Sequence, residues 1–356
     1  MKAIIKRELK NFLKNPVFWA GLIIMLVGIY QILQPYLKLH YFESDQEFQG
    51  LQVKSQDDAD VMYGYIPLTE EEQKEKAYEQ IRLTLVEEMM VPKEKADKAI
   101  EKIRDMTTEE ACNYLEREHR YYNAKYDLDN KYYEQMSVKG VNTYIKDNLQ
   151  AHSYSYYFSR KFADFAGLFM AFFATIVLAF LFLKDTRKDM YELLHTKPLS
   201  ARQYILGKVG GGYAALFIAL AVLTVFFAVV CTVHGYSEGF SVNPLDLVVA
   251  AVLYIMPNML MIVCVYAIIA LIFKNPLPAV PLLFLYIIGY SNMGATGSNG
   301  QYGYIGRLLS ITVRFPGKFF ETDMPPMVVL NQTFLILASI IIIVVAIRVW
   351  NRRRVY

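Results

Sequence analysis

Six long apolar stretches divide this chain, and they constrain its fold more than any other feature of the sequence. They lie at residues 16–34, 162–183, 209–233, 246–273, 277–293 and 330–349. A helix of about 20 mostly apolar residues is long enough to cross the ~30 Å hydrocarbon core of a bilayer. We therefore expect an all-α polytopic membrane protein with six transmembrane helices, in which the short stretch 277–293 is a tilted neighbour of the stretch before it.

Basic residues beside these stretches predict which ends face the cytoplasm. The 184–208 loop carries six lysines and arginines, whereas the 234–245 loop carries none. Flanking lysines and arginines stay preferentially on the cytoplasmic side, so both termini and the 184–208 loop are expected there. The basic residues on that side are Lys2, Lys6, Arg7, Lys10, Lys14, Lys184, Arg187, Lys188, Lys197, Arg202, Lys208, Lys274, Arg348, Arg352, Arg353 and Arg354.

The longest polar segment, residues 35–161, separates the first two apolar stretches and is expected outside the cytoplasm as a mainly helical domain. It holds 25 acidic and 18 basic residues, a net charge of −7. Long loops cross membranes largely regardless of their charge. Two Thr-x-x-Glu capping boxes, at Thr69 and Thr107, predict the starts of short helices. Residues 140–161 are expected to continue the second span outward as one long helix.

Residues 1–15 are expected to form an amphipathic helix on the cytoplasmic surface of the membrane. Apolar Ile5, Leu9, Phe12 and Leu13 fall on one face at helical spacing, while four lysines and Arg7 lie on the rest of the helix. A basic amphipathic helix of this kind lies in the plane of the lipid headgroups. We therefore predict an interfacial helix in front of the first span, and the alternative is a soluble stretch without membrane contact.

The 184–208 loop has more structure than a connector needs. Met190, Leu193 and Leu194 fall on one side of a short predicted helix, which Pro198 ends. A Ser-x-x-Gln capping box then starts the helix of the third span. Apolar residues exposed on a cytoplasmic loop require a partner. That partner is a separate cytoplasmic subunit or the N-terminal helix of the same chain, and these two interpretations are compatible.

Two features inside the apolar stretches are unusual. Gly207, Gly211 and Ala214 place small residues about one turn apart at the start of the third span, which lets another helix approach closely. We expect them to form a helix-packing or dimer face. Pro257 and Asn258 interrupt the fourth stretch, where the proline leaves a backbone carbonyl free. The asparagine is expected either to satisfy that carbonyl or to line a transport path.

The segment between the fifth and sixth stretches is rich in glycine. Five glycines recur at a spacing of three between residues 294 and 306. We expect Ile305–Val313 to form a short re-entrant or interfacial helix on the outer face. Irregular backbone at membrane depth is tolerated where protein shields it.

No motif in the sequence supplies catalytic, cofactor-binding or metal-binding residues. The nearest approach to a phosphate loop, Ile205–Val209, lacks the upstream glycine spacing and the Ser or Thr after its lysine. The five histidines are too scattered for a metal site. The basic tail 351–356 is better explained as a cytoplasmic anchor than as a patch that binds nucleic acid. We therefore expect no enzymatic activity on this chain.

Four of these features together carry a resemblance to a known family. They are the entry helix at residues 6–16 (Lys-Arg-Glu-Leu-Lys-Asn-Phe-Leu-Lys-Asn-Pro), the six-span plan, the loop 192–208 with its acidic residue, leucines, Pro-x-Ser and closing Gly-Lys, and the expected outer helix before the last span. In these respects the chain resembles the membrane-spanning permease subunit of a bacterial type-2 ABC exporter. The resemblance covers both ends and residues 162–356. The domain 35–161 departs from it, because the simplest members have a short first outer loop.

The resemblance implies a permease of the bacterial cell (plasma) membrane that pairs with itself or with a sister permease, as a homodimer or heterodimer. Two cytoplasmic ATP-binding subunits, which hold ATP and Mg²⁺, would dock under the inner loop, and this chain would carry no cofactor. Glu192 and Arg202 are the expected polar contacts of that docking, and Met190, Leu193 and Leu194 are the apolar ones. ATP-driven closure would rearrange the helices and export an amphipathic substrate, such as an antimicrobial peptide or a drug.

A function of a different class also fits the sequence. A membrane sensor or scaffold would use the extracytoplasmic domain to bind a ligand and would signal through the inner loop without transport. Copurification separates the two hypotheses. An ATP-binding subunit that accompanies the chain supports the exporter, whereas a histidine kinase, or no partner, supports the sensor.

The charge distribution predicts the result of proteolysis on sealed, right-side-out cells. Externally added trypsin is expected to cleave within residues 35–161 but not between Asp185 and Ser200, because the latter segment faces the cytoplasm. Permeabilised cells are the control, and in them both segments become accessible. Cleavage between Asp185 and Ser200 in sealed cells would place that loop on the wrong side and contradict the assignment.

Overall fold

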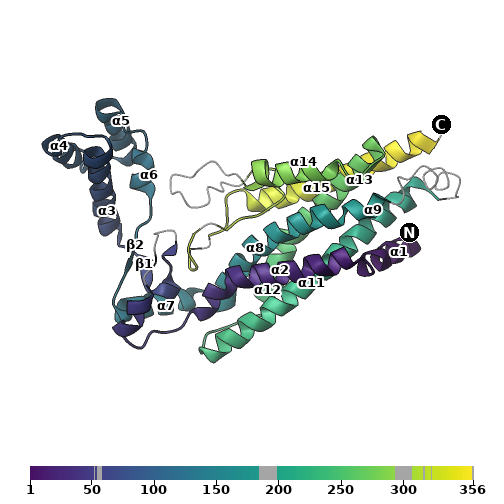
Figure 1. The fold of residues 1–356 in the computed structure, drawn as a ribbon, viewed down its shortest axis with the longest axis horizontal. Helices are drawn as coiled ribbons and strands as arrows, with labels where there is room; N and C mark the ends of the chain where they lie inside the picture. Colours follow the sequence, from purple (N-terminus) through teal and green to yellow (C-terminus); the bar gives the residue numbers. More distant parts are fainter. Residues whose placement is uncertain are drawn as a thin grey trace.

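The protein is a long helical bundle with a smaller head at one end of it (Figure 1). The computed structural model describes residues 1–51, 53, 58–183, 199–292, 307–315, 317–321 and 323–354. Both ends of the chain lie at the end of the bundle farthest from the head. We call the two ends of the bundle the head end and the terminal end.

Among the residues that the structure describes, five apolar helical segments are long enough to cross a membrane. They are Pro16–Lys38, Tyr154–Leu183, Ala201–Ser237, Leu245–Phe273 and Val328–Arg352. Their parts are α2 (Pro16–Leu33) with a 3-10 turn (Gln34–Lys38), α8 (Tyr154–Val177) with α9 (Ala179–Leu183), α11 (Ala201–Ser237), α12 (Leu245–Ala250) with a π-helical turn (Ala251–Ile255) and α13 (Met256–Phe273), and α15 (Val328–Arg354). They correspond to five of the six stretches that the sequence predicts as spans.

The remaining predicted stretch forms a shorter helix. It consists of α14 (Ala279–Tyr286) and a π-helical turn (Ile287–Asn292). Its apolar part covers Ala279–Ser291, and a helix of that length extends only ~20 Å at 1.5 Å per residue. It packs against α8 and α13, as expected for a neighbour of the fourth span. Six complete spans therefore remain a prediction.

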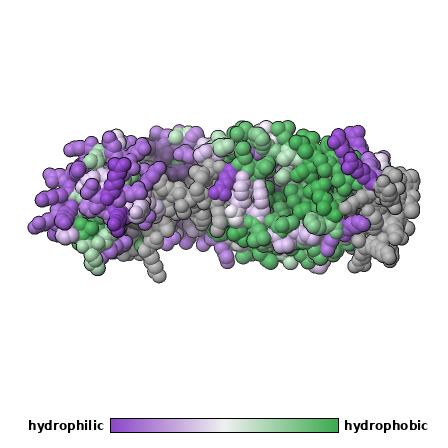
Figure 2. All heavy atoms as spheres, turned by 90° about the horizontal axis from the view of Figure 1, so that it is seen from above, coloured by the Kyte–Doolittle hydropathy of each residue, from purple (hydrophilic) through white to green (hydrophobic). Residues whose placement is uncertain are grey.

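A broad apolar surface covers the bundle, whereas the head is hydrophilic (Figure 2). Large apolar side chains such as Ile24 on α2, Val225 on α11 and Ile341 on α15 are more than half exposed. Contact with water would make each of them unfavourable by about 25 cal/mol per Å² of apolar surface, and contact with lipid removes that cost. The surface of the bundle is therefore that of a membrane protein.

Four short helices form the outer part of the head around a core of their own. They are α3 (Glu70–Leu83), extended by a π-helical turn (Thr84–Glu88), α4 (Lys93–Ile103), α5 (Thr108–His119) and α6 (Ala124–Asp129). Ile81, Leu85, Ile103 and Leu115 meet in this core and are completely buried. The head is therefore mainly helical, and its outer part does not depend on the bundle for its apolar contacts.

The base of the head joins this helical part to the bundle. An antiparallel pair of short strands, β1 (Tyr65–Pro67) and β2 (Tyr133–Gln135), brings the two ends of the helical part together. Two 3-10 turns (Asp45–Gly50 and Val61–Tyr63) and α7 (Val138–Ala151) complete the base.

The prediction of one continuous helix over residues 140–161 is wrong. α7 ends at Ala151, and His152 is extended, with φ −144° and ψ 155°. The hydroxyl of Ser153 then accepts a hydrogen bond from the backbone N–H of Tyr156, at 3.2 Å, and begins α8 as a new helix. Serine is among the residues that favour this capping position, so the break has a local signal.

The predicted helix starts at the capping boxes are confirmed. Thr69 and Thr107 cap α3 and α5 in the head, and Ser200 caps α11. In each case the hydroxyl accepts from the backbone three residues later, and the Glu or Gln at that position reaches back to the capping residue.

The chain that leads into α15 is an extended strap where the sequence predicts the helix Ile305–Val313. We define the strap as residues 307–315 and 317–321, which contain turns and no helix. Its polar groups bond to neighbouring elements instead of to a helix of their own. For example, the hydroxyl of Thr312 donates to the carbonyl of Ser291 at 3.2 Å. The helix prediction is therefore wrong over the part of that segment that the structure describes.

Candidate functional site

At the terminal end, α1 (Lys2–Leu13) packs lengthwise against the start of α11. Ile4 lies over Gly207, and Glu8 lies over Gly211. A Cβ atom at Gly207 would be 2.8 Å from the side chain of Ile4, and one at Gly211 would be 2.6 Å from the Cβ of Glu8. Both distances are shorter than van der Waals contact, so glycine is what allows this close approach. Ala214 is half-buried one turn farther along α11.

The amphipathic face of α1 is turned toward the bundle. Phe12 is buried, Leu9 and Leu13 pack against the main core, and Ile5 lies over Gly210. The lysines of the opposite face are exposed. The apolar face of α1 therefore anchors this helix to the bundle.

A buried ion pair joins α1 to two other segments. The carboxylate of Glu8 lies 3.2 Å from the ammonium of Lys208, and the two side chains are only 4% and 1% exposed. Lys208 also donates to the carbonyl of Leu181, at 2.8 Å, in the last turn of the span Tyr154–Leu183. Arg7 contacts the same carboxylate from the surface, at 3.1 Å. Because an unpaired buried charge is strongly unfavourable, this arrangement holds the three segments together.

Only one of the residues expected to contact an ATP-binding subunit lies within the described part of the chain. Arg202 is exposed in the first turn of α11. Met190, Glu192, Leu193 and Leu194 lie outside the described residues. Their role stays a prediction from the sequence.

Inside the fourth span, Pro257 follows a π-helical turn (Ala251–Ile255) that accommodates its missing N–H. The side-chain nitrogen of Asn258 donates to the carbonyl of Tyr254, at 2.6 Å. Its oxygen accepts from the side-chain nitrogen of Gln332 on α15, at 3.2 Å. Asn258 therefore satisfies a carbonyl of its own helix and also ties α13 to α15.

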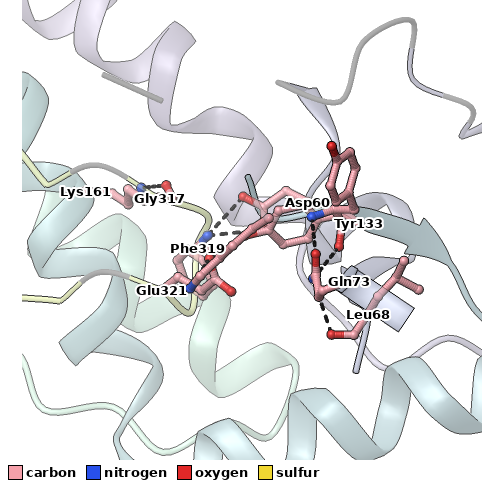
Figure 3. A network of polar contacts seen from close by, with 10 residues as sticks. Asp60, Leu68, Gln73, Tyr133, Lys161, Gly317, Phe319 and Glu321 are labelled. Carbon is pink, nitrogen blue, oxygen red and sulfur yellow. Dashed lines mark hydrogen bonds and ion pairs between the residues drawn. The ribbon is translucent and has the colours of Figure 1, made fainter. Parts of the chain in front are cut away.

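At the head end, charged side chains tie the strap to α8. Arg314 and Asp164 form an ion pair in which the side chains are 3% and 4% exposed. Lys161, also buried, donates to the carbonyls of Phe315 and Gly317, as Figure 3 shows for Gly317. The strap is therefore held to the first part of the span Tyr154–Leu183.

The same strap is tied to the base of the head (Figure 3). The carboxylate of Asp60 accepts from the backbone N–H of Phe319, at 3.0 Å. The hydroxyl of Tyr133 on β2 donates to the carboxylate of Glu321, and Lys131 lies 3.5 Å from that carboxylate. The strap thus bridges the bundle and the head.

Aromatic side chains fill the space around the strap. Phe319 is completely buried. Its ring stacks on Tyr36 at the end of the first span, with centroids 5.4 Å apart, and meets Tyr154 and Tyr157 of α8 at 5.7 and 5.9 Å. Ring pairs at these distances are favourable beyond the area that they bury. The first span, the second span and the head therefore meet at Phe319.

Asp60 is a buried titratable group of this junction that lies outside the spans. Burial raises its pKa above the ordinary value of 3.8, while Lys161 and the backbone N–H groups of Val61 and Phe319 act in the opposite direction. The protonated carboxyl is therefore favoured in the folded state relative to the unfolded chain.

The comparisons with known proteins agree with this arrangement. The family model described as ABC-2 family transporter protein matches residues 2–349, nearly the whole chain. The chain belongs to the ABC-2 transporter family. It is accordingly the permease component of an ABC transporter, which associates with ATP-binding subunits and with the membrane. No curated protein and no solved structure matches the chain significantly. Among the described residues, no group of His, Cys, Asp and Glu side chains is arranged to hold a metal ion.

Sequence reasoning found the glycines and Asn258 but missed the charged partners of this ABC-2 permease. Glu8 is the one acidic residue among the first fifteen, and Asp164 lies inside an apolar stretch. An ionisable residue inside a span is a recognised sign of a functional or structural pair. Their partners, Lys208 and Arg314, are far away in the sequence. The unusual position of an acidic residue therefore points to Glu8 and Asp164 but not to the residue that each of them pairs with.

The ion pair at the terminal end gives a first prediction. Lys208→Met leaves the Glu8 carboxylate buried with only Arg7 beside it, and we expect the free energy of unfolding to fall by about 3 kcal/mol. The combined change Glu8→Gln with Lys208→Met removes both charges and is expected to recover most of that loss. Denaturant unfolding of the detergent-solubilised protein measures both. Lys6→Met, on the exposed face of α1, is the control, and a Lys208→Met protein as stable as the control would contradict the argument.

The raised pKa of Asp60 gives a second prediction. Its favourable contribution is complete below the ordinary pKa and is lost as the pH rises through the raised folded-state pKa. Asp60→Asn is neutral and keeps an acceptor oxygen for Phe319, so the variant should gain thermal stability relative to the wild type from about pH 4 upward. Melting temperatures across this range measure the effect. Asp58→Asn, at an exposed neighbour, is the control, and a pH-independent loss in Asp60→Asn would argue against it.

Proposed function

We propose that this permease is an exporter that uses ATP hydrolysis on separate subunits to move an amphipathic substrate out of the cytoplasm. One observation carries the proposal: the span Tyr154–Leu183 is tied at both ends. Lys208 binds the carbonyl of Leu181 at the terminal end, and the strap binds Lys161 and Asp164 at the head end. A rigid helix held at both ends transmits a displacement from one to the other.

The coupling step begins at the terminal end, on the cytoplasmic side. ATP-binding subunits dock beneath the 184–208 loop, where Leu193 and Leu194 provide the apolar contact. Closure of these subunits on ATP displaces the loop and α1. The buried pair of Glu8 and Lys208 and the close glycine contacts make α1 and α11 move as one body.

At the head end the same displacement reaches the strap. Lys161 and Arg314 hold the strap to α8, and Asp60 and Tyr133 hold it to the head. We place the head outside the cytoplasm because the loops on the opposite side carry the basic residues. The head therefore changes position when the bundle opens, and it guides the substrate away from the membrane.

We infer an amphipathic substrate because the proposed path through the bundle contains both polar and apolar groups. Asn258, next to Pro257, places a polar side chain among the mainly apolar contacts of the bundle. An antimicrobial peptide or a drug fits this description. A second permease, identical or a sister chain, completes the membrane part of the transporter.

The docking role of the inner loop is tested by Leu193→Asp combined with Leu194→Asp. Charges at an apolar contact prevent its burial, so we expect the ATP-binding subunit to be lost from the detergent-extracted complex. Quantitative mass spectrometry of the purified complex and its ATPase rate measure the effect. We expect at least a tenfold loss of both, which corresponds to about 1.4 kcal/mol of binding.

The matched control carries the same kind of change on the head. Met90 and Tyr122 are exposed, at 80% and 72%, and their replacement by Asp should leave the complex intact. Retention of the ATP-binding subunit in the loop variant would exclude this docking site. Copurification of a histidine kinase in place of an ATP-binding subunit would favour the sensor.

A further inference from the structure

Two adjacent amide side chains lie buried at the start of α15, next to Asn258. Asn331 is 2% exposed and Gln332 is 8% exposed, and both belong to the membrane-spanning segment Val328–Arg352. Polar side chains inside a span are unfavourable unless they have a partner or a function. Neither residue is singled out in the sequence analysis above.

Neighbouring carbonyls determine which way each amide points. The nitrogen of Asn331 donates to the carbonyl of Ser310, at 2.9 Å, and the nitrogen of Asn258 donates to that of Tyr254, at 2.6 Å. Asn258 therefore presents its oxygen to Gln332, whose nitrogen donates to it at 3.2 Å. Reversing any of these amides would set two oxygens against each other. The side-chain oxygens of Asn331 and Gln332 must therefore point away from these contacts.

Both of these oxygens are buried and accept no hydrogen bond from any residue that the structure describes. A buried acceptor without a donor is unfavourable, and most such groups in proteins are satisfied by protein or solvent. Two such acceptors on successive residues therefore require donors, and a transported molecule can bring them.

The uncharged surroundings define the kind of donor. Three buried hydroxyl side chains lie on the strap and on the π-helical turn bonded to it, and none of them carries a formal charge. They belong to Ser291, Ser310 and Thr312. The ionised groups of Asp164 and Arg314 are already paired with each other. A cation at the amides would lack a counter-ion in a medium of low dielectric constant, whereas a neutral N–H or O–H group needs only the acceptor.

We propose that the side-chain oxygens of Asn331 and Gln332 form a binding site for neutral N–H and O–H donors, such as the amides of a peptide or the hydroxyl groups of a lipid-like molecule. That the bound molecule is the transported one rests on the export function proposed above. The site then favours substrates that carry such donors on an apolar body.

Two amphiphiles that differ in one donor test this site. N-dodecylacetamide has an N–H group, and N-dodecyl-N-methylacetamide carries a methyl group in its place. Equilibrium dialysis against the full-length protein in lipid nanodiscs measures binding, with empty nanodiscs to subtract partition into lipid. The N–H compound is expected to bind about tenfold more tightly, the contribution of one hydrogen bond to a buried acceptor. Equal affinity for the two compounds overturns the proposal.

Two variants locate the preference. Asn331→Leu removes one unpaired oxygen, and Gln332→Met combined with Asn258→Leu removes the other without leaving the Asn258 oxygen unpaired. Each variant is expected to reduce the preference for the N–H compound. Thr224→Val is the matched control, because the hydroxyl of Thr224 on α11 is also buried and without a partner among the described residues. Preference retained in both amide variants, or lost in the control, overturns the assignment. Should one amide variant fail to fold, the other tests the site.

This binding measurement does not depend on transport. A donor preference in a chain that exports nothing would leave the site standing and refute the exporter. Export by a chain that shows no donor preference would support the exporter and overturn the binding site.

Discussion

A charge enclosed in a membrane bundle must have a partner, and this requirement governs both ends of the second span. At the terminal end Lys208 bonds at once to Glu8 of α1 and to the carbonyl of Leu181. At the head end Lys161 and Asp164 bind the strap. Each bond would be weak if it were exposed to water and salt, but burial makes the loss of either partner strongly unfavourable. The span is therefore clamped by groups that separate only at high cost.

In the proposed mechanism, this clamping carries a displacement from the terminal end of the bundle to the head end. Glycines at the start of α11 let α1 approach closely, so in that mechanism the two helices move together. The strap performs the equivalent task at the other end, because it contacts the bundle and the head through different side chains. Between the two ends, the amides of Asn258, Asn331 and Gln332 are buried among mainly apolar side chains. In the proposed mechanism, the ion pairs transmit the displacement and the amides bind the substrate.

Local features of this fold were well predicted. Capping boxes at Thr69, Thr107 and Ser200 begin helices because all of their hydrogen bonds lie within four residues. Five apolar stretches form helices of membrane length because hydrophobicity summed over ~20 residues is a robust signal. The errors have two different causes. The strap forms no helix and bonds to Asp60, Lys161 and Asp164, which are distant in the sequence. The break in 140–161 has a local signal, the capping residue Ser153, which the expectation of one continuous helix overlooks.

Whether a feature can be predicted from the sequence depends on how far apart its interacting residues lie along the chain. Helix period, capping and membrane length depend on neighbours along the chain, so the order of residues alone determines the spans, the helical head and the amphipathic N-terminal helix. The pairing of Glu8 with Lys208 and of Asp164 with Arg314, 150 residues apart, depends on how helices pack in three dimensions. No spacing in the sequence encodes those contacts, because a buried charge selects whichever opposite charge the packed helices bring within reach.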